Sequence, residues 1–244
     1  MFTLFRKWRA HKNGTYQLYG CGNRYAGRPD KSGSVFINML PNLPTSELSF
    51  RFADQSYSLA VPVADFVKQW HLQQPNAAFP YWAKLWPSAI ALCQYIGSHT
   101  PIFTNKKVIE LGAGLGLPSA VVATYAQQVF CTDIDAQAVA FMPQQPCLNQ
   151  PNIVCKELDI FEFSGEVQQQ KIDEIICADV NYTPALFTQL LSKIQYWQSL
   201  GCGITIASPQ RLLANDFAQQ LNLLTTIHPT YYVQQETIRI WRIQ

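Results

Sequence analysis

Residues 108–119 read VIELGAGLGLPS, and this stretch gives the first indication of the fold. A short apolar run with Glu110 inside it is followed by glycines at alternate positions, 112, 114 and 116. Glycine lets the backbone turn tightly and approach a ligand without a Cβ in the way. Pro118 suits the first turn of a helix. The stretch predicts a strand, a glycine loop and a helix, although such loops also occur as plain turns.

Segments with strand and helix periodicity alternate on both sides of this loop. The expected strands cover residues 106–112, 128–133, 152–159, 173–180, 202–208 and 236–244. The expected helices cover residues 87–97, 117–127, 136–150, 185–200 and 214–224, the third of them broken by its prolines. This alternation predicts an α/β fold with a mostly parallel sheet and helices on both faces. The strict alternation in 236–244 is typical of an edge strand.

The segments before this α/β pattern divide the chain into three parts. Residues 1–45 form an irregular basic N-terminal extension, and residues 46–75 carry a hairpin and a short helix. Residues 76–244 form the main domain. With 244 residues, 48% of them hydrophobic, the chain suits one sizeable core.

Positive charge is concentrated at the start of the chain. Residues 1–40 hold seven Lys or Arg and one acid, whereas the whole chain has a net charge of +2. This start fits an organelle presequence, a nucleic-acid contact or a poorly ordered terminus. The acidic remainder disfavours nucleic acid, and no apolar span of membrane length is present. We expect a soluble, cytoplasmic monomer, and seven cysteines without a CxxC pair disfavour a metal site.

The spacing of the glycines in the loop narrows the choice of ligand. A dinucleotide loop needs a glycine at position 117, where Leu117 stands, and a triphosphate loop needs a Lys followed by Ser or Thr. Glu110 is unsuited to a phosphate and suited to a cation. Asp133 ends the next strand, about twenty residues on, where an acid binds a ribose diol. A cationic nucleoside without phosphate, S-adenosyl-L-methionine, satisfies these conditions.

The pattern E-L-G-x-G-x-G, followed by a strand ending in Asp133, resembles the first two motifs of the class I (seven-β-strand) methyltransferases. The resemblance implies a Rossmann-like seven-stranded sheet. It also implies that Asp133 holds the ribose hydroxyls and that Asp159 contacts the adenine amino group, unless Asp159 is only a solvated acid at a strand end. Further cofactor contacts implied in the same way are Gly112, Ala113, Gly114, Gly116, Ile134, Ile160 and Ala178.

The aromatic segment FPYWAKLWPSAIAL, residues 79–92, precedes the loop. Trp82 and Trp86 are four residues apart, a spacing for which core packing is the ordinary explanation. The segment also resembles the one before the cofactor loop in the non-SET protein lysine methyltransferases. The resemblance implies that Trp86 and Trp82 pack on the cofactor, where an aromatic face attracts a sulfonium.

The segment ADVNYTP, residues 178–184, ends the strand that faces the methyl group in class I enzymes. It lacks the two prolines of enzymes that methylate amides or adenine, and it resembles the D-x-x-Y pattern of the lysine family. A lysine amine has a reference pKa near 10.4, so it must be captured and deprotonated. Asp179 is expected to capture the lysine and Tyr182 to wall its channel; the alternative role for Asp179 is capping the next helix.

The sequence therefore predicts an N-methyltransferase that acts on a lysine side chain of a protein. Within the family the chain resembles enzymes that methylate the electron-transfer-flavoprotein β-subunit, and this resemblance implies that the subunit is a candidate partner. Two alternatives stay open: a nicotinamide methyltransferase-like enzyme for small amines or pyridines, and a non-catalytic cofactor-binding module. Ser208 replaces an aspartate of the family pattern, so substrate contacts there are in doubt.

Overall fold

The structure is a computed structural model that forms two compact units, residues 1–44 and 45–244. In the first unit, where an irregular extension is expected, β1 (Tyr16–Leu18) pairs antiparallel with β2 (Val35–Ile37). The structure describes residues 16–18, 35–37, 43–73, 78–163, 169–180, 184–210, 215–225 and 229–244.

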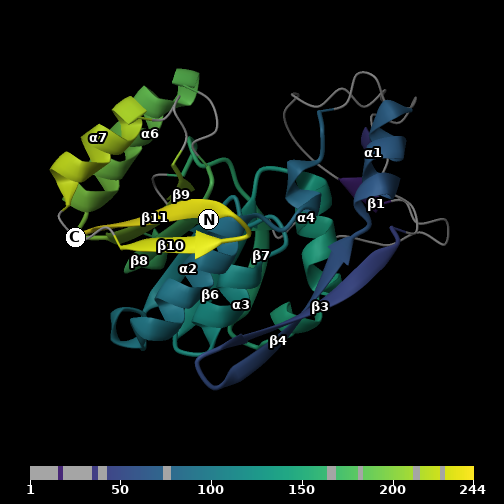
Figure 1. Ribbon diagram of the computed structural model, residues 1–244, viewed down its shortest axis with the longest axis horizontal. Helices are drawn as coiled ribbons and strands as arrows, with labels where there is room; N and C mark the ends of the chain where they lie inside the picture. The colour runs from purple at the N-terminus through teal and green to yellow at the C-terminus, as the bar shows by residue number, and fades with distance from the viewer. Residues whose placement is uncertain are drawn as a thin grey trace, which may run out of the picture. The chain divides into compact units, whose positions relative to one another are not determined.

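A seven-stranded sheet forms the centre of the second unit, with the order β10-β11-β9-β8-β5-β6-β7 (Figure 1). Its strands are β5 (Lys107–Leu111), β6 (Gln128–Asp133), β7 (Ile153–Glu157), β8 (Glu174–Ala178), β9 (Gly203–Pro209), β10 (Thr230–Val233) and β11 (Glu236–Ile243). The five strands β5 to β9 run parallel, and β10 and β11 are antiparallel to their neighbours. The predicted Rossmann-like, mostly parallel sheet is confirmed.

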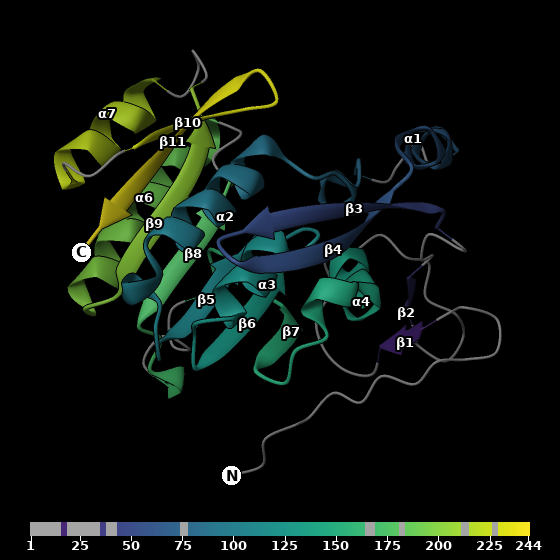
Figure 2. The same cartoon turned by 60° about the horizontal axis from the view of Figure 1, so that its bottom comes forward.

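Helices cover both faces of this sheet (Figure 2). They are α2 (Pro87–Ser98), α3 (Leu117–Ala123), α4 (Ala136–Phe141), α6 (Pro184–Ser199) and α7 (Asn215–Leu224). On the α6 and α7 side, Leu190, Ile194 and Trp197 pack on alternate residues of the central strands, including Ile109 and Leu111. Because side chains alternate along a strand, Val108 and Glu110 belong to the opposite face, covered by α2 and α3.

The position predicted for the last strand was wrong. The segment 236–244 was expected at an edge, but β11 lies between β9 and β10, and the edge strand is β10. The two strands are joined by a turn at Gln234 and Gln235, which have φ angles of 47° and 67°. Such turns usually contain Asn or Gly, so this Gln-Gln turn gave no sequence signal and β10 was missed.

A two-stranded hairpin precedes the sheet, as predicted. It consists of β3 (Thr45–Phe52) and β4 (Gln55–Pro62), and α1 (Ala64–Leu72) follows it. The buried amide side chain of Gln145 binds the backbone of one β4 residue twice: Ala60 N donates to Oε1 at 2.9 Å, and Nε2 donates to Ala60 O at 2.8 Å. Tyr57 Oη lies 2.9 Å from Thr124 Oγ1. These contacts dock β4 on the main domain.

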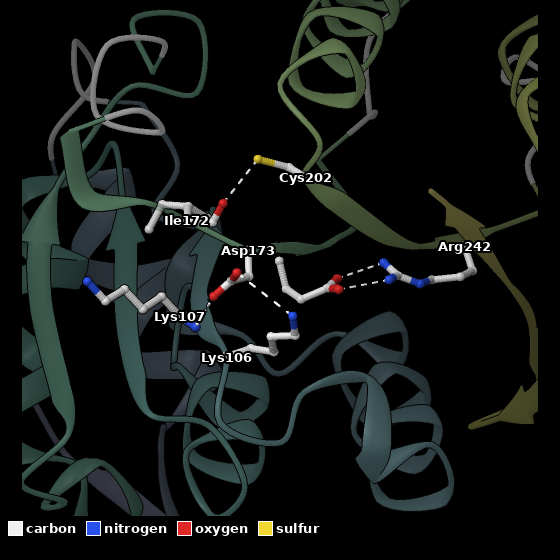
Figure 3. A network of polar contacts seen from close by, with 7 residues as sticks. Lys106, Lys107, Ile172, Asp173, Cys202 and Arg242 are labelled. Carbon is white, nitrogen blue, oxygen red and sulfur yellow. Dashed lines mark hydrogen bonds and ion pairs between the residues drawn. The ribbon is translucent and has the colours of Figure 1, made fainter.

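A polar network occupies the amino-terminal edge of the parallel strands, opposite the glycine loop (Figure 3). The carboxylate of Asp173 accepts the backbone N–H of Lys107 at 2.8 Å and lies 3.9 Å from Lys106 Nζ. Arg242 donates two hydrogen bonds to Glu174, of 2.7 and 2.8 Å, and both side chains are buried. This edge carries structural contacts, which leaves the carboxyl edge for the ligand. Among the described helices, none combines the length and the apolar character needed to cross a membrane.

Candidate cofactor and methyl-acceptor site

The glycine loop after β5 has the backbone that its sequence requires. Gly112, Gly114 and Gly116 all have positive φ angles, of 67°, 55° and 76°, which residues with a Cβ rarely adopt. Gly116 is the N-cap of α3. The hydrogen bond from Gly116 N to Ala113 O, 2.8 Å, closes the loop into a tight turn. The three predicted glycines therefore shape one continuous turn at the carboxyl end of β5.

Close neighbours of these glycines show which segments meet at the loop. A Cβ on Gly112 would lie 3.0 Å from Val180 Cγ1, and one on Gly114 would lie 3.3 Å from the carbonyl oxygen of Trp82. The loop thus lies between the aromatic segment and the residues that follow β8. The sequence placed these two segments far apart in the chain, and the fold brings both against the glycines.

Asp133 supports the loop from the end of β6. Its Oδ2 accepts the backbone N–H of Gly114 at 2.8 Å, and its Oδ1 accepts that of Asp135 at 2.9 Å. The residue is only 7% exposed, and burial raises the pKa of its carboxyl above the usual value although these hydrogen bonds lower it. A carboxylate oxygen has two lone pairs. Asp133 can therefore hold the loop and still accept hydrogen bonds from a ligand.

Glu110 lies beneath the loop, fully buried. Its Oε2 accepts two hydrogen bonds from Ser119, from the backbone N at 2.8 Å and from Oγ at 2.6 Å. Burial raises the pKa of Glu110 to about 8, and the bonds from Ser119 act in the opposite direction. The side chain ties the end of β5 to the first turn of α3. Sequence reasoning missed Ser119; its signal is a polar residue in the first turn of an otherwise apolar helix.

The two predicted tryptophans occupy different environments. Trp82 is 6% exposed, packs against Phe141 with ring centroids 5.4 Å apart, and has a buried Nε1 with no hydrogen-bond partner among the described residues. Trp86 is partly exposed, donates from Nε1 to the carbonyl of Tyr81 at 3.1 Å, and carries the Lys84 ammonium 4.0 Å from its ring centroid. Of the two, Trp82 is the one whose backbone touches the glycine loop.

The ends of β6 and β7 are neighbours. Leu158 N donates to Asp133 O at 2.9 Å, which places Asp159 beside the strand end that carries the predicted ribose ligand. Asp159 Oδ1 accepts the backbone N–H of Phe161 at 2.8 Å and so folds the loop after β7. Ile134, just after Asp133, is 49% exposed, and Ile160 is half-buried. Both isoleucines have apolar surface available at this edge of the sheet.

Asp179 follows β8 directly after Ala178. Its φ of 57° is unusual for a residue with a side chain, and its N–H donates to Ala207 O at 2.8 Å on β9. Such backbone conformations concentrate at functional sites. Helix α6 begins at Pro184, so Asp179 is too far upstream to be its N-cap. Tyr182 and Arg211 lie outside the described residues, while Ser208 is buried within β9.

The chain is similar in sequence to known methyltransferases. A family described as lysine methyltransferase matches residues 75–223. The protein N-lysine methyltransferase METTL21A of Xenopus tropicalis is 30% identical over 166 residues, which cover 66% of this chain and 77% of that protein. The electron transfer flavoprotein beta subunit lysine methyltransferase of Mus musculus is 28% identical over 137 residues, 54% of this chain and 51% of that one.

Solved structures share the fold. The N-methyltransferase NodS from Bradyrhizobium japonicum, in complex with S-adenosyl-L-homocysteine, aligns with a TM-score of 0.53 at 17% identity. The alignment covers 72% of this chain and 97% of NodS. At this identity the likeness describes the fold alone.

Proposed function

We propose how this chain, which belongs to the lysine methyltransferase family, carries out its reaction. It is an S-adenosylmethionine-dependent N-methyltransferase, and its family acts on lysine side chains of proteins. Three segments meet at the carboxyl edge of the sheet: the glycine loop, the aromatic segment and the residues after β8. This meeting is the observation that supports a reaction site there. The glycine loop contacts the backbone of Trp82 on one side and Val180, beside Asp179, on the other.

The described residues fit S-adenosylmethionine. A Cβ on Gly112 or Gly114 would come within 3.0–3.3 Å of Val180 or Trp82, so glycine allows these segments to approach the loop closely. In our proposal the loop passes beneath the methionine moiety, Asp133 accepts the ribose hydroxyls, and Asp159 with Ile160 receives the adenine. The buried Nε1 of Trp82, which has no hydrogen-bond partner in the described part of the chain, would be a donor for the ligand in this proposal. When bound, the cofactor supplies an electrophilic methyl group.

The acceptor side of the proposal rests on Asp179. A carboxylate attracts the lysine ammonium, and its position between the loop and β9 lets it orient the amine. The half-buried Val180 adds an apolar wall, which favours the neutral, nucleophilic amine over the ammonium. Tyr182 completes the channel in this proposal. Holding the amine in line for attack is the main contribution of such a site.

Asp179→Asn tests this assignment, with Asp216→Asn on α7 as a matched control in the same protein. We expect the first variant to lose methyl transfer by about 100-fold, the lower range for a positioned catalytic group, and to bind S-adenosylhomocysteine as tightly as wild type in calorimetry. The control should keep both properties. Unchanged transfer by Asp179→Asn would remove Asp179 from the acceptor site. If Asp179→Asn instead lost cofactor binding, Asp179 would be assigned to the cofactor site.

The substrate protein is the finer part of the proposal. The similarity to an electron transfer flavoprotein beta subunit lysine methyltransferase makes this subunit the first acceptor to test. Purified enzyme, radiolabelled cofactor and purified subunit should give label retained on the subunit, at a lysine identified by peptide mass spectrometry. Label that appears only in a dialysable product would instead favour a small-molecule amine. The unrelated protein lysozyme is the negative control.

A further inference from the structure

Two cysteines face each other on neighbouring strands below the cofactor loop. In the parallel register of β6 and β7, Cys131 is the direct partner of Cys155. Direct partners share a face of the sheet, and neighbouring strands lie about 4.8 Å apart. This spacing is within the range of about 4.4–6.8 Å between the Cα atoms of a disulfide. The register therefore brings both thiols within reach of one bond.

The pair lies against the glycine loop. Cys131 is fully buried, with its Sγ 3.7 Å from Met142 Sδ. The same Sγ is 3.1 Å from the position that a Cβ on Gly116 would occupy. Cys155 is partly exposed. One thiol is thus accessible to a reagent from solvent, and the other lies beneath the last glycine of the loop.

The two thiols also differ from the other described cysteines in their acid–base chemistry. A hydrogen bond from Cys131 lowers the pKa of Cys155, although burial opposes this. The pKa of Cys131 is raised, first by that hydrogen bond and then by burial and by Glu110. A thiolate is the reactive form of cysteine, so Cys155 is the nucleophile of the pair. Burial raises the pKa of the remaining described thiols, Cys93, Cys147, Cys177 and Cys202.

We propose that Cys131 and Cys155 form a reversible disulfide when the protein meets a hydroperoxide, and that this disulfide weakens cofactor binding. The Cys155 thiolate attacks the hydroperoxide, the O–O bond breaks, and Cys155 becomes a sulfenic acid while an alcohol leaves after taking up a proton. The Cys131 sulfur then attacks the Cys155 sulfur, and its proton leaves with the hydroxyl group as water. Two thiols are oxidised by two electrons, and the peroxide is reduced.

The effect on the cofactor follows from the position of Cys131. Forming the bond draws its sulfur towards β7 and away from Met142 and the Gly116 turn. Two residues further along β6, Asp133 holds the N–H of Gly114. A shift of this strand therefore acts on both supports of the glycine loop. The effect on cofactor binding rests on the proposed function, whereas disulfide formation depends only on the strand pair β6 and β7.

The test treats the full chain with tert-butyl hydroperoxide and follows intact mass. We expect the loss of two hydrogens, reversed by dithiothreitol, and peptide mapping with Asp-N protease and chymotrypsin should place the link between Cys131 and Cys155. Cys131→Ser should stop at a sulfenic acid on Cys155 that dimedone traps, and Cys155→Ser should not react. Cys202→Ser, at the opposite edge of the sheet, should oxidise like the wild type.

Calorimetry with S-adenosylhomocysteine completes the test. Oxidation should raise the dissociation constant by about tenfold, the cost of a modest backbone strain, and dithiothreitol should restore it. A pairing of other cysteines, no change in mass, or an unchanged dissociation constant in the linked protein would each overturn the inference. Absence of binding by the reduced protein would instead count against the proposed function, since the mass measurement does not depend on methyl transfer.

Discussion

Replacing Glu110 with glutamine tests the buried acid beneath the cofactor loop. The pKa of Glu110 is raised from 4.5 to about 8, chiefly because burial disfavours the charged form. Between these two values the folded protein keeps a proton that the unfolded chain has released. The contribution of Glu110 to the free energy of unfolding is therefore fully present below pH 4.5 and is lost as the pH rises to about 8. The pKa difference corresponds to about 5 kcal/mol.

Urea denaturation of wild type and Glu110→Gln between pH 5 and pH 9 measures this quantity. Glutamine keeps a carbonyl that can accept both hydrogen bonds of Ser119, and the other titrating groups are common to both proteins. We expect the free energy of unfolding of wild type to fall by about 4 kcal/mol relative to the variant over this pH range, mostly below pH 8.

Ser119→Ala provides the matched control. It removes the Oγ hydrogen bond that lowers the pKa of Glu110, so the fall in stability should extend to higher pH than in wild type. A difference between wild type and Glu110→Gln that stays constant within about 1 kcal/mol from pH 5 to pH 9, below one pKa unit, would refute the reasoning. Glu110 would then ionise in the folded protein much as it does in water.

Two further predictions concern the glycine loop and the far edge of the sheet. Gly116→Ala places a Cβ 2.7 Å from Leu148 Cδ1 at a φ of 76°, so it should destabilise by about 2–4 kcal/mol and weaken S-adenosylhomocysteine binding in calorimetry. Gly201→Ala, with a φ of 80° and open space around it, should cost only about 1–2 kcal/mol; equal losses would contradict the packing argument. Arg242→Met leaves Glu174 buried without its partner and should cost about 3–5 kcal/mol in urea denaturation. Adding Glu174→Leu should recover most of this loss, and no recovery would show that the charge is not the cause.

Local sequence signals predicted most of the fold because the hydrophobic residues of each strand and helix recur with the period of that element. The β-branched run before the loop became β5, and the prolines after α4 end it at Phe141, where two short 3-10 turns take over. The glycines were predictable as well, since all three adopt positive φ angles. The turn between β10 and β11 could not be predicted in this way, because it is formed by Gln234 and Gln235 and glutamine is not a typical turn residue.

The site was harder to predict because its contacts join distant segments. Periodicity gives no reason to place Trp82 against Gly114, and only the resemblance to lysine methyltransferases connected them; the structure brings their atoms together. Ser119 was missed because its role depends on the buried carboxylate of Glu110, nine residues earlier. All the cofactor roles, those of Asp133 and Asp159 included, and the acceptor roles of Asp179 and Tyr182 stay predictions.

The ion pair between Glu174 and Arg242 reaches across an intervening strand. Glu174 is on β8 and Arg242 on β11, and between them β9 presents Gly203, where a Cβ would collide with both side chains. A slip of β11 by one residue would move the guanidinium to the other surface of the sheet and leave two isolated charges without solvent. The pair therefore selects the observed alignment of β11, because a shifted last strand would lose the energy of this buried contact.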